Sequence, residues 1–403
     1  MIKHALLRQH LFHGAVRLTV LALAAAGLTA CSSGTSTVDA RSGTAEPVIL
    51  TPLSTSVQTS DGTWATVPMG HLDQPLNTFW QLLFRPTGTD SWSNHVEATA
   101  TATNGGLVLA SAGGPSLLVG VRPSNLLAFS PLIVTADEGR SWSNGLLSDG
   151  LAAHPDALAV GPTAKALALV GSRNGEKVLE STNDLSKWQT LTTEHSLASS
   201  TPGRTCRLGS ITAVAYLAAF PVVGATCSRP GVVGMFSQSA GSWHLVGPAL
   251  PASLHSDTVE VVALRSTKAG LSTLLAVSDK SATSLVAAWT TTGNRWSVSR
   301  PLHLGAPDQV ASFGPATGDG FFVLLSEPSG SKRLEVLGGP GSTWLELPAP
   351  PAGTATVAFG PRTTVEALAV NDTTLTVWTL ASNPDAWVRG QITQVPIQFG
   401  SSG

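Results

Sequence analysis

Short apolar stretches alternate with polar, glycine-rich turns along most of the chain, and a tryptophan follows many of these turns. The segments V-T-A-D-E-G-R-S-W, F-S-Q-S-A-G-S-W and L-G-G-P-G-S-T-W show the shape that recurs. The tryptophans that end such turns are Trp92, Trp142, Trp188, Trp243, Trp296, Trp344 and Trp387. Their spacing of 43–55 residues predicts a repeated structural unit.

A second marker recurs with the same period. Gly-Pro pairs occur 27–30 residues before four of these tryptophans, at Gly114-Pro115, Gly161-Pro162, Gly314-Pro315 and Gly360-Pro361. Each pair follows an apolar stretch, and a β-strand does not easily continue through proline. We therefore expect each unit to hold a first strand, a Gly-Pro turn, two further strands, a polar turn and a strand that bears the tryptophan.

Four antiparallel strands in about 45–50 residues is the size of one blade of a β-propeller. The repeats predict an all-β protein, a seven-bladed β-propeller of four-stranded antiparallel blades in residues 57–403. Six or eight blades are the alternatives, because the first unit is the least regular. Trp64, in T-S-D-G-T-W, is an additional turn tryptophan and a candidate for a split or closing blade.

The composition agrees with stacked sheets and argues against nucleic acid as a partner. Of the 403 residues, 42% are hydrophobic and 12% are charged, about half of the usual charged fraction. The formal net charge is −2, and no basic block occurs beyond the N-terminus. Because phosphate binding needs a concentrated positive face, a nucleic-acid role is not expected.

The first thirty residues have the pattern of a secretory signal. Lys3, Arg8 and Arg17 precede an apolar run at residues 18–28, which is too short to be a comfortable transmembrane span. The end of this segment, Leu28-Thr29-Ala30-Cys31, resembles the lipobox of bacterial lipoproteins. The resemblance implies that residues 1–30 are removed and that Cys31 carries acyl chains.

Lipidation of Cys31 would hold the protein on the extracytoplasmic face of the cell membrane. The alternative is an ordinary signal cleavage, with Cys31 incidental. Residues 31–56 then form the lipidated end and a flexible tether. The mature chain keeps 20 of its 23 basic residues against 25 acidic ones, a net charge of −5, which predicts no polybasic attraction to anionic lipid.

The two remaining cysteines, Cys206 and Cys227, are expected to pair in an oxidising compartment. They lie before the innermost strand of the fourth unit and near the end of its second strand, which are neighbouring positions in an antiparallel pair. Two buried free thiols are the alternative.

The segment T-A-D-E-G-R-S-W resembles the Asp-box, or BNR repeat, of sialidase-like propellers, with the pattern S/T-x-D-x-G-x-x-W. The match places Thr135, Asp137, Gly139 and Trp142 in a structural turn between third and fourth strands. A partial copy keeps Ser181, Asn183 and Trp188. Asp side chains fix such turns by accepting backbone N–H groups, and glycine adopts conformations that other residues resist.

The chain shows little of a sialidase active site. The family uses three arginines, a Tyr–Glu pair and an Asp, whereas this chain has a single tyrosine, Tyr216, on a predicted inner strand. Phe84-Arg85-Pro86 is only partly similar to a family arginine segment, and Arg85 is expected to be a surface or turn residue. No metal-ligand spacing, nucleophile elbow or phosphate loop occurs, so neither a metal nor a cofactor is expected.

One set of polar residues precedes the inner strands of three units. Its members are His154, Asp156, His255, Asp257, His303 and Asp308. In a propeller such positions face one mouth of the central channel. Each Asp is expected to start a strand by bonding the loop backbone, or else the set forms a ring that binds a cation or a sugar.

These features favour a membrane-anchored, non-catalytic binding or scaffold module. Its partner is a carbohydrate or an envelope protein. The alternative is a divergent glycoside hydrolase of sialidase-like fold, which would need two carboxylates at a defined separation in the channel mouth.

Overall fold

The computed structural model divides the chain into two compact units, Met1–Gly43 and Thr44–Gly403. It describes residues 54–70, 78–95, 106–121, 131–146, 154–161, 165–171, 175–185, 187–255, 257–279, 282–305, 308–360, 364–382 and 385–395, all in the second unit. The signal segment, Cys31 and most of the tether lie outside these residues. Within them, no helix has the length and apolar character needed to cross a membrane.

Five antiparallel four-stranded sheets follow the chain order, each a simple meander. The first three are β1 (Ser56–Gln58), β2 (Gly62–Gly70), β3 (Thr78–Pro86) and β4 (Ser93–Asn94); β5 (Leu107–Ala110), β6 (Leu117–Val121), β7 (Pro131–Thr135) and β8 (Ser143–Leu146); and β9 (His154–Val160), β10 (Ala166–Gly171), β11 (Lys177–Thr182) and β12 (Trp188–Thr193). The last two are β22 (Gln309–Pro315), β23 (Phe321–Ser326), β24 (Lys332–Leu337) and β25 (Leu345–Leu347); and β26 (Thr354–Phe359), β27 (Val365–Asn371), β28 (Thr374–Ser382) and β29 (Asp385–Gln394).

A nine-stranded sheet stands between the third and fourth of these. Its strands are β13 (Leu208–Leu217), β14 (Phe220–Cys227), β15 (Gly234–Ser239), β16 (Ser242–Leu245), β17 (Thr258–Thr267), β18 (Gly270–Ser278), β19 (Thr283–Thr290), β20 (Trp296–Val298) and β21 (Leu302–His303). Strands β14 and β17 pair only through Thr226 with Glu260 and Cys227 with Val259. Two short helices, α1 (Glu194–Ser199) and α2 (Thr201–Cys206), precede β13.

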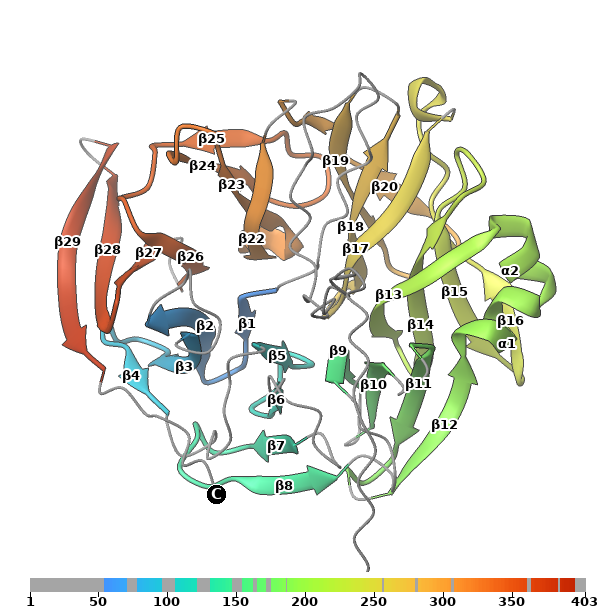
Figure 1. The fold of residues 1–403 in the computed structure, drawn as a ribbon, viewed down its shortest axis with the longest axis horizontal. Coiled ribbons are helices and arrows are strands. Elements are labelled where there is room, and N and C mark those ends of the chain that lie inside the picture. Colours follow the sequence, from blue (N-terminus) through green and yellow to red (C-terminus); the bar gives the residue numbers. More distant parts are fainter. Residues whose placement is uncertain are drawn as a thin grey trace, which may run out of the picture. The chain divides into compact units, whose positions relative to one another are not determined.

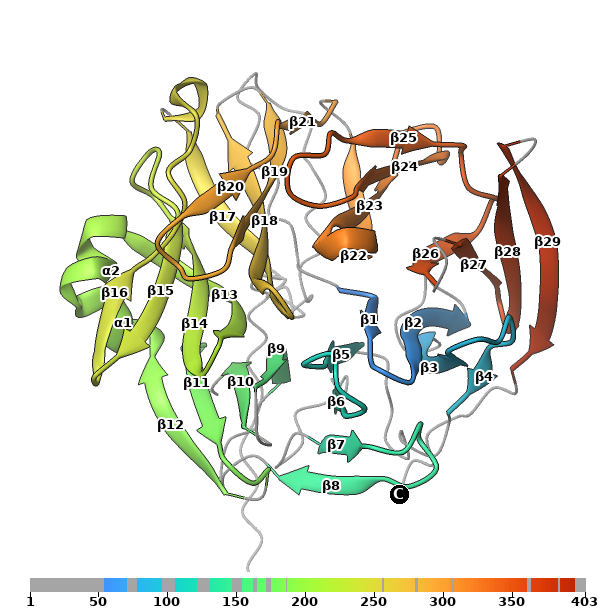
Figure 2. The ribbon, with the colours of Figure 1, turned by 180° about the vertical axis from the view of Figure 1, so that it is seen from behind.

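The apolar core lies between successive sheets rather than in one centre. Middle strands such as β19, with all eight residues buried, are apolar on both faces because each face packs against a neighbouring sheet. Separate buried clusters join β2–β3 to β5–β7, β5–β7 to β9–β11, β9–β11 to β13–β15, β13–β15 to β17–β19, β17–β19 to β22–β24 and β22–β24 to β26–β28. Figures 1 and 2 show these sheets following one another around a common centre.

A further cluster joins the last sheet to the first, so the series closes on itself. Ala65, Val67 and Met69 of β2 pack there with Leu368 of β27 and Val377 of β28. No strand is exchanged between these two sheets among the described residues, and their contact consists of side chains and a few hydrogen bonds.

Arg85 belongs to this closure, and its expected place on the surface is wrong. The residue is on β3, is 2% exposed and forms an ion pair with Glu366 of β27. The indole N–H of Trp92 donates to the same carboxylate over 2.9 Å, and the guanidinium lies 5.3 Å from the Trp92 ring centre. The partner carboxylate is at the opposite end of the repeat region, which explains why the local sequence gave no sign of burial.

Trp64 belongs to the first sheet, which is not split because its four strands are consecutive in the chain. It lies on β2, is 1% exposed, and stacks on Phe84 with ring centres 4.3 Å apart. The folded region also starts slightly before residue 57, because β1 begins at Ser56 and Thr55 is buried.

The repeat tryptophans lie within two residues of the start of the outermost strands, as their spacing predicts. Three of them donate their indole N–H to a carbonyl just after the outermost strand of the preceding four-stranded meander. Trp296 bonds the carbonyl of Val246 at 2.9 Å, and Trp344 and Trp387 bond those of Arg300 and Pro348 at 3.1 Å. These indoles therefore link each outer strand to the meander before it in the chain.

Candidate functional site

The innermost strands enclose a cavity of about 580 Å³. Residues of β1, β5, β9, β13, β17 and β22 line it, together with Asp319 and Phe321. The lining mixes apolar side chains such as Val108 and Leu264 with polar ones such as Gln58, Thr212 and Ser266. These innermost strands can carry polar residues because their inner edge faces the cavity and not another sheet.

Arg265 is a charged residue of this cavity lining that several contacts hold in place. Its Nε donates to the hydroxyl of Ser272 at 3.3 Å and its Nη2 to the carbonyl of Gly320 at 3.1 Å. The guanidinium also lies 5.2 Å from the ring centre of Phe321. Burial lowers the pKa of Arg265 to about 10, and the nearby Asp319 opposes that change, so the side chain stays cationic at neutral pH.

A second charged group gathers near the starts of β9 and β17. Lys177 lies 3.4 Å from the carboxylate of Asp156, which lines the cavity, and donates to the carbonyl of Ile211 at 2.9 Å. Burial raises the pKa of Glu260 to about 7, and Lys177 acts in the opposite direction. Glu260 is therefore about half protonated near neutral pH. The lysine that acts on it, Lys177, also pairs with the carboxylate of Asp156. Glu260 had no role in the sequence-based expectations.

Of the six His and Asp residues expected around a channel mouth, only Asp156 is on the cavity lining in the described part of the chain. His255 bonds the carbonyl of Leu250 through Nε2 at 2.7 Å, and His303 bonds the Ser284 hydroxyl through Nδ1 at 2.8 Å. A separate set of contacts holds the acids: Asp308 accepts the backbone N–H of Gly305 at 2.9 Å and pairs with Arg333 at 2.8 Å, and the carbonyl of Asp257 accepts Gly231 N–H at 2.8 Å.

These contacts match the strand-starting role for Asp308. The side chain of His154 lies outside the described residues. Among those that are described, no group of three or more His, Cys, Asp or Glu residues is placed to hold a metal ion.

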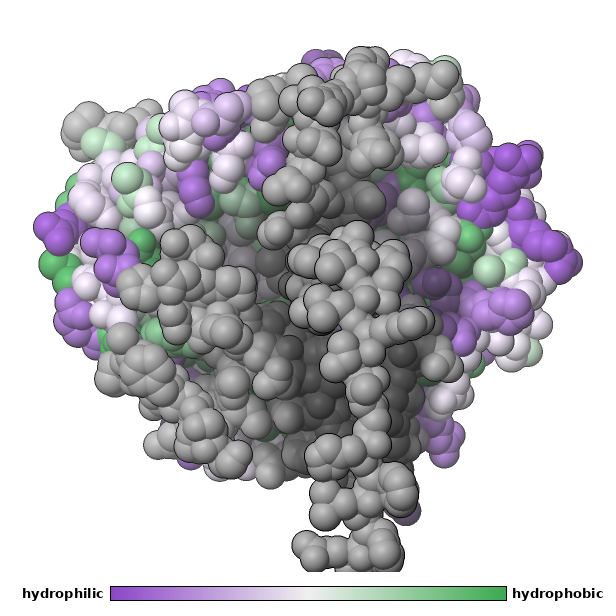
Figure 3. Space-filling model, viewed as in Figure 1, coloured by the Kyte–Doolittle hydropathy of each residue, from purple (hydrophilic) through white to green (hydrophobic). Residues whose placement is uncertain are grey.

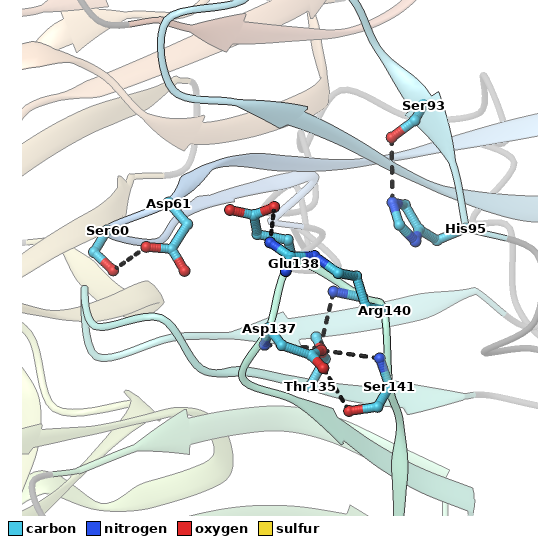
Figure 4. A network of polar contacts seen from close by, with 10 residues as sticks. Ser60, Asp61, Ser93, His95, Thr135, Asp137, Glu138, Arg140 and Ser141 are labelled. Atoms are coloured by element: carbon cyan, nitrogen blue, oxygen red, sulfur yellow. Dashed lines mark hydrogen bonds and ion pairs between the residues drawn. The ribbon is translucent and has the colours of Figure 1, made fainter.

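The turn at Thr135–Trp142 connects β7 to β8, and hydrogen bonds from side chains within the turn stabilise it (Figure 4). Asp137 accepts the backbone N–H of Ser141 at 2.9 Å and its hydroxyl at 2.6 Å, and it also accepts the Thr135 hydroxyl at 2.9 Å. Thr135 in turn accepts the N–H of Gly139 at 2.9 Å. Gly139 has φ +80°, and a Cβ there would come within 2.5 Å of His95. The acceptor groups of Asp137 and Thr135 are thus used to fix the turn.

The turn before Trp188 uses different residues from those expected. Its acceptors are Thr182 and Asp184 instead of Ser181 and Asn183: Asp184 accepts the Thr182 hydroxyl at 3.1 Å and the Lys187 N–H at 3.0 Å. The motif is thus shifted by one residue from the expected positions. Asp184 still follows Thr182 by two positions, as Asp137 follows Thr135. Leu185 takes the left-handed conformation here, with φ 61°.

Replacing Asp137 with Ala should lower the melting temperature by about 2–4 °C, because Ser141 N–H and two hydroxyls lose their acceptor. Hydrogen bonds from the Ser141 hydroxyl and then its backbone lower the pKa of Asp137 to about 2 from 3.8. Since the folded pKa is the lower one, this contribution is complete above about pH 4 and is lost as the pH falls towards 2.

Thermal melts of the variant and wild type at pH 7 and at stepwise lower pH check this, and the gap should close at acid pH. Glu138→Gln in the same turn is the control, because its carboxylate meets only the exposed Arg140. Equal melting of wild type and Asp137→Ala at pH 7 would refute the structural role.

Cys206, at the end of α2, and Cys227, at the end of β14, form a disulfide with Cα atoms 5.1 Å apart. Tyr216, on β13, is 4% exposed and packs in the cluster between β9–β11 and β13–β15. Burial raises the pKa of its hydroxyl to about 12, so this side chain is a core residue and a poor nucleophile at neutral pH.

No protein-family model and no curated protein matches the chain. Among solved structures, a putative 6-phosphogluconolactonase from Bacteroides uniformis is 10% identical, with 84% of this chain and 98% of that chain covered and a TM-score of 0.54. The GH74 xyloglucanase from Xanthomonas campestris is 12% identical with a TM-score of 0.51; the match covers 85% of this chain but only 55% of the xyloglucanase.

YCF48 from Cyanidioschyzon merolae is 14% identical over 83% of this chain and 97% of its own, with a TM-score of 0.43. At these identities the likeness shows architecture alone. The chain is therefore an all-β protein of four-stranded antiparallel sheets whose fold is similar to that of β-propellers.

Proposed function

We propose that the protein is a seven-bladed β-propeller, held by a lipid on the extracytoplasmic face of the cell membrane, that binds a ligand without catalysis. The observation that carries the binding role is the central cavity, with Arg265 fixed in it. Its volume of about 580 Å³ falls in the usual range of small-molecule sites, about 300–1,000 Å³.

The blade number rests on the core. The nine-stranded sheet contains two four-stranded meanders, β13–β16 and β17–β20, joined by two residue pairs. Counting them separately gives seven sheets, and the described buried clusters are also seven, one for each junction of a closed ring. We further infer that Thr135–Trp142 is an Asp-box, because Asp137 and Gly139 do in this turn what that motif requires.

A carbohydrate is the ligand class that fits the lining best, because sugars present hydroxyls to polar groups and C–H faces to apolar ones. A soluble oligosaccharide that fills the cavity at about 100 times its Kd should raise the melting temperature by several degrees. Arg265→Gln should weaken this shift, while Arg389→Gln on β29 serves as the control. If no member of an oligosaccharide panel shifts the melt, the carbohydrate proposal is contradicted, and binding of envelope proteins is the next test.

Glycoside hydrolysis is the second candidate, and Glu260 is the observation that favours it. A carboxylic acid with a pKa near 7 is what general acid catalysis of glycosides uses, and Lys177, which acts on Glu260, also lies 3.4 Å from the carboxylate of Asp156. Against it, Glu260 is not among the described residues that line the cavity, and the arginine cluster that would favour a sialidase-like enzyme is not found on the described lining, which holds a single arginine, Arg265. Release of reducing ends from the same panel, lost in Glu260→Gln, would decide for the hydrolase.

The anchor rests on Cys31 and the lipobox resemblance. Cys31→Ser should release the protein from membranes or leave it unprocessed, because the acyl chains have no other attachment point in this motif. Labelled palmitate should enter the wild type and not the variant, and Ser32→Ala should behave as wild type. A variant that stays membrane-bound with normal processing would exclude the lipoprotein assignment.

A further inference from the structure

One part of the chain lacks negative charge altogether. Residues 195–256 contain no Asp or Glu, although the whole chain has 25 of them. The same segment contains three arginines, Arg204, Arg207 and Arg229, and no lysine. It covers α2 and the four strands β13–β16, so this helix, the meander and the loops that join them carry positive formal charge only.

The three arginines lie at one corner of this sheet. Arg204 is in the last turn of α2, Arg207 follows that helix in the left-handed conformation with φ 52°, and Arg229 follows β14. Backbone bonds join the two segments: Arg229 N–H donates to the Cys206 carbonyl and Ser228 N–H to the Arg207 carbonyl, each at 3.1 Å. The Cys206–Cys227 disulfide fixes the same junction. We call these three residues the arginine corner.

The guanidinium groups of the arginine corner are available to a partner. All three side chains are exposed, and none forms an ion pair with a carboxylate in the part of the chain that the structure describes. Arg204 and Arg229 make single contacts with the carbonyls of Ser199 and Thr205, which leave further donors on each group. Figure 3 shows hydrophilic side chains gathered on the side of α1 and α2.

The two acids that flank this segment in the sequence, Glu194 and Asp257, form no ion pair with the corner in the described residues. Glu194 accepts the hydroxyl of Ser210 at 3.0 Å and the N–H of Ile211 at 2.9 Å. Asp257 approaches through its backbone carbonyl, which accepts the N–H of Gly231. Elsewhere in the described residues Arg85, Arg140 and Arg333 pair with Glu or Asp, whereas the ion pairs do not include Arg265, Arg295, Arg300 or Arg389.

We propose that the arginine corner docks the protein on the phosphodiester headgroups of anionic lipids in the membrane that carries its anchor. This rests on the proposed lipidation of Cys31, which lies 23 residues before Ser54 and so keeps the folded region within about 80 Å of the headgroups even at full extension. Guanidinium groups bind phosphate oxygens with two parallel hydrogen bonds. The net charge of −5 for the mature chain conceals this local surface.

Because the lipid anchor already holds the protein at the membrane, a small docking energy is sufficient to orient it. Each basic side chain near an anionic surface favours the bound state severalfold, so three should favour the docked over the undocked orientation by about 100-fold. A lipid tether already supplies a high effective concentration of headgroups. Docking would orient the ring with one chosen edge towards the membrane.

The test uses the lipidated protein in vesicles of phosphatidylcholine alone or with about 30% phosphatidylglycerol. Hydrogen exchange in residues 201–209 and 226–231 should slow in the anionic vesicles only, and about 0.5 M salt should abolish the effect. The variant R204Q/R207Q/R229Q should lose the protection, and R204K/R207K/R229K should keep most of it. The control R295Q/R300Q/R389Q removes the same charge from other sheets and should leave the protection unchanged.

Each failure has its own meaning. Equal exchange in both vesicle types, or protection that survives in R204Q/R207Q/R229Q, would overturn docking while leaving the anchor intact. The same protection from inorganic phosphate without vesicles would identify a free-anion site instead of a membrane contact. Protein that does not insert its lipid into vesicles would contradict the anchor. In that case docking is tested separately: sedimentation with anionic vesicles that requires the three arginines would support it, and no sedimentation would contradict it.

Discussion

Replacing Glu366 with Gln should destabilise the fold by about 3–5 kcal/mol, because it leaves the guanidinium of Arg85 buried without a counter-charge. Both side chains of the pair are 2–3% exposed, so water cannot take the place of the carboxylate. Two nitrogens of Arg85, Nε and Nη2, have no hydrogen-bond partner among the described residues, which makes the ion pair the main compensation for burial. Urea denaturation of variant and wild type measures the difference.

The matched control is the double variant Arg85→Met with Glu366→Leu, which removes both charges and keeps apolar volume. It should recover most of the lost stability, since replacing a buried ion pair by apolar groups is often neutral. Glu138→Gln, which breaks the exposed pair with Arg140, should change the melting temperature little. If Glu366→Gln alone melts as the wild type does, the pair does not hold the first and last sheets together.

Removing the disulfide should cost about 3 kcal/mol, with 2–5 kcal/mol as the range for such bonds. The bond closes a loop with a sequence separation of 21, and both cysteines are fully buried. The double variant Cys206→Val with Cys227→Val keeps apolar volume, so its loss of stability should report the cross-link more than a new cavity. Chemical denaturation measures it, and peptide mapping without reductant should find the two peptides joined.

A reductant provides the control for this prediction. Wild type under reducing conditions should lose stability towards that of the valine variant, which should itself be unaffected by the reductant. Wild type and variant that unfold at the same denaturant concentration, or two freely alkylated thiols in protein from the cell envelope, would contradict it.

The sequence was sufficient for the repeat but not for the contacts between distant repeats. Gly314-Pro315 does end β22, and the turn tryptophans do mark the outer strands, because proline and glycine act on the local backbone. Cys206 and Cys227 could be paired because both positions belong to one unit. Arg85 could not be placed, because its burial depends on Glu366, which lies at the other end of the repeat region.

The candidate site was predicted only in part. Asp156 lies on the cavity, but Arg265 and Glu260 carried no sequence signal: each is a charged residue on an otherwise ordinary strand, and its environment comes from neighbouring sheets. The helices α1 and α2 were also missed, since each has six residues and depends on caps at Thr193 and Ser200. The arginine corner was also missed, because the net charge was considered for the whole chain and not for each part of it.

The indole bonds of Trp296, Trp344 and Trp387 bear on how such a chain can change length. Each bond joins a unit to the one before it with the same donor and the same kind of acceptor. A duplicated unit would bring its own tryptophan and offer its own carbonyl, so neither neighbour would be left with an unmatched group. Gain or loss of whole units by gene duplication or deletion is therefore compatible with this bonding, whereas the Arg85–Glu366 pair is specific to the two ends and must stay where the ring closes.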